Sequence, residues 1–406
     1  MIDILFGIIF FTALVVLLAL AVISARAFVF TSKPVTVSVN GARELPARVG
    51  LKLLGALLDD GIAVPAACGG NGTCGLCRVT VTAGGGEALP TEVAHLSRRE
   101  IKKGLRLACQ VTIRGDIGVR VPEEILGIEP MECVVRSART LSPLIKEIVL
   151  DLPPEIQFKY RPGAYVLVTV PAYDICFSEM NVAAEHEPAW DQFDLRKIKI
   201  ASAVPVTRAY SIANTPAERD CIVLLIRLAL PPPSDITLPP GLASTYLFSV
   251  SEEDRLSVVG PHGDFGAQDS EREMVFVGGG VGMAPLRAII FDQLERLGTK
   301  RKISFWYGAR NAIDLFYVDE FDALAKRHDN FKWIAALSDP AAGDEWEGST
   351  SFIHDVVFED YLKRHPSPQD CEYYLCGPPL MIEAVLSMLE GVGVDDESIF
   401  NDDFGS

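Results

Sequence analysis

The hydrophobic and polar positions change their period several times along the 406-residue chain. A run without a charged residue extends from Ile4 to Ala25, which is the length that an apolar helix needs to cross a bilayer. Ala25-Arg26-Ala27 resembles a signal-peptide cleavage site, but the flank before the run carries only Asp3, and the run is too long for a signal sequence. We therefore predict an uncleaved transmembrane anchor in residues 1–28.

Short strands and short helices follow in residues 33–128. Three segments have the composition or alternation of strands: Val35–Val39, Arg78–Thr82 and Cys109–Ile113. Asn40-Gly41 is a hairpin signal, and leucines at helical spacing predict a helix between Arg48 and Asp59. Ser97 and Glu100 form a capping box that predicts the start of a second short helix. The segment therefore has the pattern of a small α+β domain.

Residues 129–270 have an all-β pattern, because their apolar runs are short and are separated by Pro and Gly. The strand candidates are Cys133–Arg136, Ile145–Leu150, Tyr165–Val170, Cys221–Ala229 and Arg255–Val259. A polar, aromatic-bearing segment at about 171–203 interrupts them, and we predict an inserted loop. A surface insertion and a docking loop for a membrane partner are both open readings. We expect His186 in this segment, which has carboxylates beside it, to be solvated rather than a metal ligand.

From residue 271 to residue 406 strands alternate with helices, which is typical of a parallel, doubly wound α/β sheet. The predicted strands are Met274–Val277, Lys302–Tyr307, Lys332–Leu337 and Tyr373–Cys376. One predicted helix contains Phe291, Leu294 and Leu297. Three more lie near Val318–His328, Phe352–Arg364 and Leu380–Leu389.

Charge restricts the partners and the topology. The formal net charge of −17 argues against nucleic-acid binding, because phosphate contacts need a basic surface. The first basic residues after the apolar run are Arg26, Lys33, Arg43 and Arg48. The positive-inside rule therefore places the rest of the chain on the cytoplasmic side of the membrane.

Four cysteines form the strongest chemical signal. Cys68, Cys74 and Cys77 have C-x5-C-x2-C spacing with four glycines among them, and Cys109 follows later. Thiolates bind iron, and glycines let backbone N–H groups approach the sulfurs, so the pattern predicts a [2Fe–2S] cluster. A zinc site usually has two short-spaced pairs, and the other five cysteines are too scattered for a disulfide framework.

Two motifs in the all-β segment have the chemistry of a flavin site. Arg208-Ala-Tyr210-Ser211 supplies a cation for a pyrophosphate, an aromatic wall for the isoalloxazine ring and a hydroxyl near the flavin N5. Gly241-Leu-Ala-Ser244-Thr245 supplies backbone donors for the pyrophosphate. If the motif is considered alone, Tyr210 also fits the core of a strand, and Arg208 also fits an ion pair on the surface.

The α/β segment carries a dinucleotide signature. A strand leads directly into the run Gly278, Gly279, Gly280, Val281, Gly282, Met283, Ala284 and Pro285. A glycine loop before a helix presents N–H groups to a pyrophosphate, and Pro285 suits the first helical turn. Cys376 ends the last predicted strand and begins the motif Cys376-Gly377-Pro378. The alternative reading of Cys376 is a buried thiol, and we do not expect Cys376 to act as a nucleophile.

In this order the motifs resemble the ferredoxin-reductase superfamily. Two of its families share the order of ferredoxin, flavin and nicotinamide modules: the reductase components of bacterial oxygenases, and the F subunits of Na⁺-translocating NADH:quinone reductase. The chain is similar to the F subunits over almost its full length. The residues that carry this similarity are the Ile4–Ala25 run, the 171–203 insertion, Gly278–Pro285 and the terminal Asp402-Asp403-Phe404-Gly405.

The resemblance implies a multidomain fold and a reaction. It implies a β-grasp [2Fe–2S] ferredoxin domain at 33–128, a six-stranded antiparallel FAD-binding β-barrel at 129–270 and an NADH-binding domain at 271–406. Cys376 would lie near the nicotinamide, and Phe404 would cover the flavin face opposite Tyr210 and move for the nicotinamide; a frayed terminus is the alternative. NADH would reduce FAD by hydride transfer, and the cluster would then receive single electrons.

The resemblance also implies a partner set. It places the chain as a single-pass protein of the bacterial inner membrane, in a complex with five other subunits, with ubiquinone as final acceptor and Na⁺ as the pumped ion. A membrane-tethered reductase for an oxygenase and a scaffold with a vestigial flavin site are the alternatives. The intact motifs argue against the scaffold.

A chain that begins at Lys33 should hold about one flavin and two irons, because it contains one predicted flavin site and one predicted [2Fe–2S] site. In that chain Cys74→Ala should abolish the EPR signal of the cluster but spare bleaching of the flavin by NADH, because the motifs lie in separate domains. Loss of flavin bleaching in a folded variant would show that the predicted domain division is wrong.

Overall fold

The computed structural model describes residues 12, 14–18, 33–66, 68–126, 129–218, 220–231, 238–341 and 345–402. The described residues of Met1–Val64 and Gly75–Gly127 form one compact unit, and those of Pro65–Cys74 and Ile128–Ser406 form another. In the described part of the chain, no helix has both the length and the apolar character needed to span a bilayer. Apart from residues 12 and 14–18, the predicted anchor in residues 1–28 lies outside the described residues.

The first unit is built on a five-stranded sheet with the order β2-β1-β5-β3-β4. Its strands are β1 (Pro34–Val39), β2 (Arg43–Arg48), β3 (Arg78–Ala83), β4 (Leu105–Leu107) and β5 (Ile117–Arg120), and its helices are α2 (Leu53–Asp59), α3 (Pro90–Val93), α4 (Arg98–Lys102) and α5 (Glu123–Leu126). Strand β1 pairs in parallel with β5, and the other pairs are antiparallel. Helix α2 buries Leu53, Leu54 and Leu57.

Local signals in this unit are mostly confirmed. Asn40 and Gly41 have φ angles of 53° and 70°, as a hairpin turn of this kind requires. Ser97 Oγ accepts a hydrogen bond from Glu100 N at 3.3 Å, and Glu100 Oε2 accepts one from Ser97 N at 2.7 Å, which completes the capping box. Helix α2 begins later than we predicted, because the preceding residues Arg43–Arg48 pair with β1 as a strand.

The predicted strand at Cys109–Ile113 is wrong. The strand in this region is β4, which ends at Leu107, and the N–H groups of Gln110 and Val111 both donate to the Leu107 carbonyl. The chain therefore turns at Cys109, and the residues after the turn form an isolated antiparallel bridge between Thr112 and Lys52 instead of a strand. Alternating apolar residues after a turn imitate a strand when their side chains fill a core, as the buried Val111 and Ile113 do here.

The second unit begins with an antiparallel six-stranded sheet in the order β11-β8-β13-β6-β7-β12. Its strands are β6 (Met131–Ser142), β7 (Ile145–Asp151), β8 (Tyr165–Val170), β11 (Val206–Ser211), β12 (Cys221–Arg227) and β13 (Arg255–His262). A bridge between Ile212 and Leu224 joins the two edges, so the sheet closes as the predicted barrel. Helix α7 (Leu242–Ser249) places Ala243 and Leu247 in the barrel core.

The segment at 171–203 is a folded insertion rather than the polar loop that we predicted. Its elements are β9 (Tyr173–Cys176), η1 (Phe177–Glu179), η2 (Ala184–His186), α6 (Glu187–Gln192), η3 (Leu195–Lys197) and β10 (Lys199–Ser202), and β9 pairs with β10. Phe177 and Trp190 are fully buried in an apolar core that the insertion shares with Leu228 and with Phe248 of α7. The expected solvation of His186 is also wrong, because its side chain is only 4% exposed and burial lowers its pKa.

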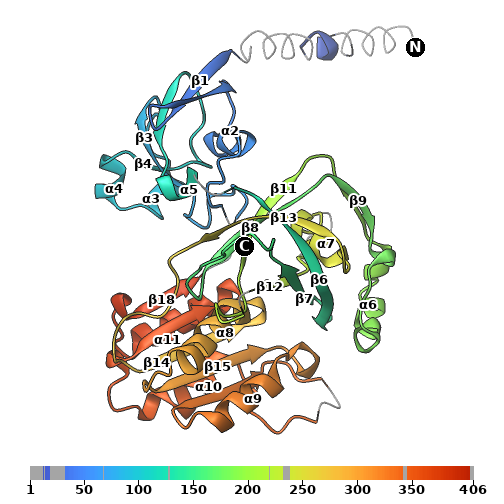
Figure 1. The fold of residues 1–406 in the computed structure, drawn as a ribbon, viewed down its shortest axis with the longest axis vertical. Coiled ribbons are helices and arrows are strands. Elements are labelled where there is room, and N and C mark those ends of the chain that lie inside the picture. The colour runs from blue at the N-terminus through green and yellow to red at the C-terminus, as the bar shows by residue number, and fades with distance from the viewer. Residues whose placement is uncertain are drawn as a thin grey trace, which may run out of the picture. The chain divides into compact units, whose positions relative to one another are not determined.

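A parallel five-stranded sheet completes the second unit, in the order β16-β15-β14-β17-β18 (Figure 1). Its strands are β14 (Met274–Gly279), β15 (Ile303–Ala309), β16 (Phe331–Leu337), β17 (Glu372–Cys376) and β18 (Ile399–Asp402). The connecting elements are η4 (Gly280–Gly282), α8 (Met283–Phe291), a π-helical turn η5 (Asp292–Arg296), η6 (Ala312–Asp314), α9 (Val318–Arg327), α10 (Ile353–Asp360), η7 (Leu362–Arg364), η8 (Pro368–Asp370), α11 (Pro379–Gly391) and η9 (Asp396–Ser398).

Two apolar cores cover the two faces of this sheet. Met274 and Phe276 pack with α8 and α9 on one face, and Val275 and Val277 pack with α10 and α11 on the other. This alternation confirms the doubly wound α/β prediction. Strand β18 was not predicted, because its four residues directly precede a polar, acidic chain end.

Glu92→Ala should destabilise the first unit by about 3–5 kcal/mol, because it leaves the buried Arg106 without its ion-pair partner. The Arg106–Glu92 pair is 2.7 Å long and almost wholly buried. Burial opposes ionisation of Glu92, but hydrogen bonds from Arg106, Leu89 and Leu107 hold its pKa below the ordinary value. This contribution should be present above the ordinary glutamate pKa and be lost as the pH falls through the lowered pKa.

Hydrogen exchange of the segment Leu105–Arg120 measures this effect. Glu100→Ala is the matched control, because Glu100 pairs with Arg78 in an exposed position and should change protection far less. Equal protection in both variants would contradict the role assigned to the buried pair.

Candidate functional site

The cysteine loop of the second unit holds one pair of predicted cluster ligands. Cys68 Sγ and Cys74 Sγ are 3.3 Å apart. The hydrogen bond with the Cys74 side chain, with further hydrogen bonds from the backbone of Cys74, Thr73 and Gly70, lowers the pKa of Cys68 to about 3 against the effect of burial. Gly69, Gly70 and Gly72 have positive φ angles, which side chains rarely tolerate.

The other pair of predicted ligands lies in the first unit. Cys77 and Cys109 are buried, and Cys109 N lies 3.4 Å from Cys77 Sγ as a donor. The side-chain amide of Gln110 donates to Cys109 Sγ at 3.3 Å. Within its own unit, each pair presents thiol sulfurs that accept N–H hydrogen bonds, as the thiolate ligands of an iron–sulfur cluster do.

The predicted flavin residues lie on β11 and at the start of α7, two elements that pack against each other. Arg208, Tyr210 and Ser211 belong to β11, whereas Gly241 is the N-cap residue of α7, and Ser244 and Thr245 lie in its first turn. Burial raises the pKa of Tyr210, so its phenol stays neutral. Arg208 donates from Nη1 to the Thr207 carbonyl at 2.8 Å.

The first turn of α7 fits a pyrophosphate. Thr245 Oγ1 is fully buried and has no hydrogen-bond partner among the described residues. Ser244 Oγ donates to the Gly241 carbonyl at 3.0 Å and accepts from Ala229 N at 3.2 Å, which holds the turn in shape. Free N–H groups at a helix start, together with an orphaned buried hydroxyl, are the donors that a phosphate needs.

The predicted nicotinamide residues lie at the carboxyl ends of neighbouring parallel strands. Gly278 and Gly279 end β14, Gly280 and Gly282 form η4, Met283 and Pro285 begin α8, Cys376 ends β17, and Gly377 and Pro378 precede α11. Strands β14 and β17 are adjacent, and the chain order reverses between them. This topological switch point is where open α/β sheets bind their ligands.

The glycine loop touches the chain after β17 through its backbone. A Cβ at Gly282 would overlap the carbonyl oxygen of Cys376 and lie 2.7 Å from Gly377 N. A Cβ at Gly377 would lie 3.0 Å from Gly279 N. Only glycine allows this approach, so the backbone of the loop lies directly against the end of β17, and a glycine loop of this kind at a helix start fits a dinucleotide.

The two predicted sites meet at Asp402. Ser211 Oγ lies 3.3 Å from Asp402 Oδ2 and donates to it, and Asp402 is the β18 partner of Cys376 in β17. Ser211, Tyr165 and His262 are also partners across β11, β8 and β13. Thus a predicted flavin residue and a predicted nicotinamide residue flank one carboxylate. Phe404, which we predicted to cover the flavin, lies outside the described residues.

Asp402 and His262 were not predicted as site residues. Burial lowers the pKa of His262 to about 4, so it is neutral near pH 7, and its Nε2 has no partner among the described residues. The signal for Asp402 was its place two residues before the predicted capping Phe404. No local signal pointed to His262, because only strand register brings it beside Tyr165 and Ser211.

Buried polar contacts join the barrel to the sheet. Arg287 on α8 donates to Glu320 at 2.8 Å and to the Ala213 carbonyl at 2.9 Å, and it stacks on the Tyr317 ring. The Tyr317 hydroxyl donates to Glu147 of β7. These contacts fix the positions of the predicted flavin residues and the glycine loop relative to one another.

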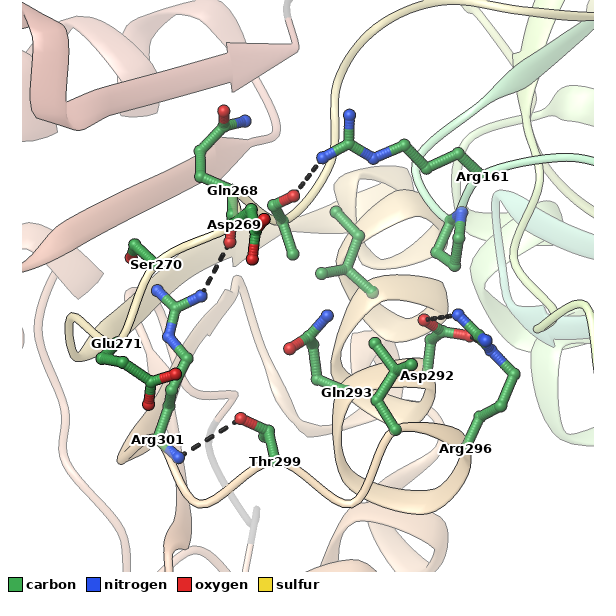
Figure 2. Close-up of a pocket in the computed structure, with 14 residues that line it drawn as sticks. Arg161, Gln268, Asp269, Ser270, Glu271, Asp292, Gln293, Arg296, Thr299 and Arg301 are labelled. Atoms are coloured by element: carbon green, nitrogen blue, oxygen red, sulfur yellow. Dashed lines mark hydrogen bonds and ion pairs between the residues drawn. The ribbon is translucent and has the colours of Figure 1, made fainter.

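One pocket of the second unit lies away from the predicted cofactor residues. It encloses about 350 Å³ and contains none of the predicted cofactor residues. Figure 2 shows its three arginines already engaged: Arg161 with the Ala267 carbonyl, Arg296 with Asp292, and Arg301 with the Gln268 carbonyl. Asp292 neutralises Arg296 and Glu372 neutralises Arg301, whereas Arg161 donates to a neutral carbonyl.

Glu273, His365 and Cys371 form a second cluster, in which the candidate ligand atoms lie within 4.8 Å of one another. It does not favour a metal. Lys302 Nζ lies 3.2 Å from Glu273 Oε1 and neutralises it, while the Tyr361 hydroxyl donates to the same oxygen. Ser367 N donates to His365 Nδ1, which leaves the proton on Nε2, the nitrogen that faces Glu273.

The residues at the end of β15 concern the choice between NADH and NADPH. Arg310 follows this strand and pairs with Asp339 at 3.4 Å, and both side chains are exposed. An arginine at this position is able to meet a 2′-phosphate, but here a carboxylate stands beside it.

Two protein-family models match parts of the chain. Residues 37–114 match the 2Fe-2S iron-sulfur cluster binding domain, and residues 276–387 match the oxidoreductase NAD-binding domain. Full-length relatives carry the name of the F subunit of Na(+)-translocating NADH-quinone reductase. That of Methylococcus capsulatus is 48% identical over 406 residues and covers 100% of both chains. That of Neisseria meningitidis is 46% identical over 403 residues and covers 99% of this chain and 100% of its own.

Solved structures share the fold. The Amycolatopsis cytochrome P450 reductase GcoB has 26% identity and a TM-score of 0.62, over 91% of this chain and 98% of its own. The ferredoxin reductase in carbazole 1,9a-dioxygenase has 24% identity and a TM-score of 0.57, over 92% and 98%. The second likeness concerns the fold alone.

Gly282→Ala should weaken the apparent binding of NADH at least tenfold, or by about 1.4 kcal/mol, because the new methyl group pushes the glycine loop away from Cys376. The dependence of the flavin bleaching rate on NADH concentration, measured by rapid mixing, gives this affinity. Gly391→Ala is the control, since a Cβ there meets nothing within 4 Å. An unchanged affinity in Gly282→Ala would remove the loop from the site.

Proposed function

The chain belongs to the family of the F subunits of Na(+)-translocating NADH-quinone reductase, and we propose that it is the electron-input component of such a complex. It is an NADH-oxidising reductase that uses FAD and a [2Fe–2S] cluster, and it is part of a multi-subunit assembly. The observation that carries the proposal is the meeting of Ser211, Asp402 and Cys376 beside the glycine loop.

The proposed roles follow from the contacts. Cys68, Cys74, Cys77 and Cys109 hold the cluster; Arg208, Gly241, Ser244 and Thr245 hold the FAD pyrophosphate; Gly278, Gly279, Gly280, Gly282, Met283, Pro285, Gly377 and Pro378 form the NADH cradle. When bound, FAD accepts a hydride from NADH and the cluster accepts one electron at a time.

The residues of the chain supply orientation and proton placement. Tyr210 provides a neutral aromatic wall for the flavin ring, and Phe404 covers the opposite face in the absence of nicotinamide. Ser211 directs its hydroxyl proton to Asp402, so the hydroxyl has a defined orientation near the place where hydride arrives. Cys376 is fully buried and excludes water beside the nicotinamide instead of acting as a nucleophile.

The finer assignments belong to the same proposal. Residues 1–28 anchor the chain by one helix in a bacterial inner membrane, and the domains at 33–128, 129–270 and 271–406 lie on the cytoplasmic side. The complex has six subunits and passes electrons to ubiquinone while it pumps Na⁺. Asp339 beside Arg310 opposes a 2′-phosphate, so we expect a preference for NADH over NADPH.

A reductase for an oxygenase is the second candidate. It is favoured by the likeness to the Amycolatopsis cytochrome P450 reductase over 91% of the chain. Against it, the relatives with almost twice that identity match the whole chain, including its first 28 residues.

Isolation from solubilised membranes of the native host separates the two candidates. The proposal expects several polytopic subunits to copurify and expects Na⁺ to stimulate quinone reduction by NADH. K⁺ at the same ionic strength is the control for a salt effect. A copurifying hydroxylase, with activity indifferent to Na⁺, would refute the proposal and favour the second candidate.

A further inference from the structure

The insertion holds α7 near both of its ends. At the start of the helix, the Tyr173 hydroxyl of β9 donates to the Leu242 carbonyl at 2.6 Å, and the Tyr173 ring lies 5.5 Å from the Tyr246 ring. At the other end, Trp190 of α6 stacks on Phe248 with ring centroids 5.8 Å apart. Two elements of the insertion therefore contact this helix, one near each of its ends.

Trp190 is itself rigidly held. Its side chain is fully buried, and its Nε1 donates to the Pro143 carbonyl at 2.7 Å. Arg196 covers the ring at 4.9 Å and is fixed in turn by Glu187 at 2.6 Å and by the Met180 carbonyl at 2.6 Å. A side chain with this many contacts is held rigidly and does not adapt to a displaced neighbour.

Lys146 secures the same end of α7 from the barrel. Its buried ammonium donates to the Phe248 carbonyl and lies 5.0 Å from the centre of the Phe248 ring. A cation at the carboxyl end of a helix is favourable, because the last carbonyls there have no helical partner. Phe248 is therefore held between the barrel and the insertion.

These contacts matter for the opposite end of α7. A helix of eight residues is too short to be stable alone, so tertiary contacts decide its position. The first-turn N–H groups and Thr245 Oγ1 need to converge on the phosphate oxygens, and a binding group displaced by about 0.5 Å loses much of its effect.

We propose that the insertion is a positioning element for FAD, and that Tyr173 and Trp190 are positioning residues that aim the start of α7 at the FAD pyrophosphate. This inference rests on the proposed assignment of Gly241, Ser244 and Thr245 to that pyrophosphate. It gives the insertion a role inside the reductase, distinct from that of a docking loop.

Equilibrium dialysis of FAD against the detergent-solubilised full-length chain tests the inference. Trp190→Ala should weaken FAD binding at least tenfold, and Tyr173→Phe by a few-fold to about tenfold, because it removes one hydrogen bond. Trp190→Phe keeps an aromatic ring against Phe248 and should restore most of the affinity. Phe193→Ala is the matched control from the same insertion, since this ring is 61% exposed, and it should bind FAD normally.

A second readout separates positioning from general damage. At saturating FAD, Trp190→Ala and Tyr173→Phe should bleach with NADH at the wild-type rate and keep the EPR signal of the cluster. Normal FAD affinity in Tyr173→Phe and in a folded Trp190→Ala would overturn the inference. So would an activity loss in both variants that excess FAD does not repair.

Thr245→Val distinguishes failure of the inference from failure of the site assignment. Weaker FAD binding in Thr245→Val together with normal binding in the two insertion variants would overturn only the role of the insertion. Normal FAD binding in Thr245→Val would remove α7 from the pyrophosphate site, and the inference would fall with it.

Discussion

The contact between the glycine loop and the carbonyl of Cys376 is the constraint on which the reductase unit depends. Because Gly282 has no side chain, η4 lies against the end of β17 at the switch point of the sheet. The same strand end pairs with β18, which brings Asp402 beside Cys376. From Asp402 one hydrogen bond reaches Ser211 in the barrel, so a backbone contact in one sheet sets the geometry across two domains.

Polar contacts preserve that geometry where an apolar interface would allow sliding. Arg287 contacts Glu320, Tyr317 and the Ala213 carbonyl at once, and Tyr317 reaches Glu147 in the barrel. Each contact is directional, and a buried donor or acceptor left unpaired is costly, so few relative positions of barrel and sheet satisfy all of them. The insertion adds a similar restraint on α7, through Tyr173 and Trp190.

Local sequence predicted much of the fold and failed in recognisable places. The all-β and alternating α/β patterns, the Asn40-Gly41 turn and the Ser97 cap were predictable, because each depends on residues close together in the chain, whereas the barrel was expected from the family resemblance. The strand expected at Cys109–Ile113 was wrong, because apolar alternation also suits residues that fill a core after a turn. The insertion was mistaken for a polar loop, since its buried residues follow no single period, and β18 is too short to have a pattern.

For the site, short stretches of sequence are enough to predict which chemistry the chain contains. Cysteine spacing, the glycine loop and the Arg208–Ser211 motif are local patterns, and each group they are predicted to bind needs those residue types at close spacing. Which of these residues meet depends on the tertiary structure. Asp402 lies between Ser211 and Cys376, and His262 lies beside Tyr165, because strand register joins residues far apart in the chain. Register follows from the packing of whole sheets, and no short stretch of sequence contains it.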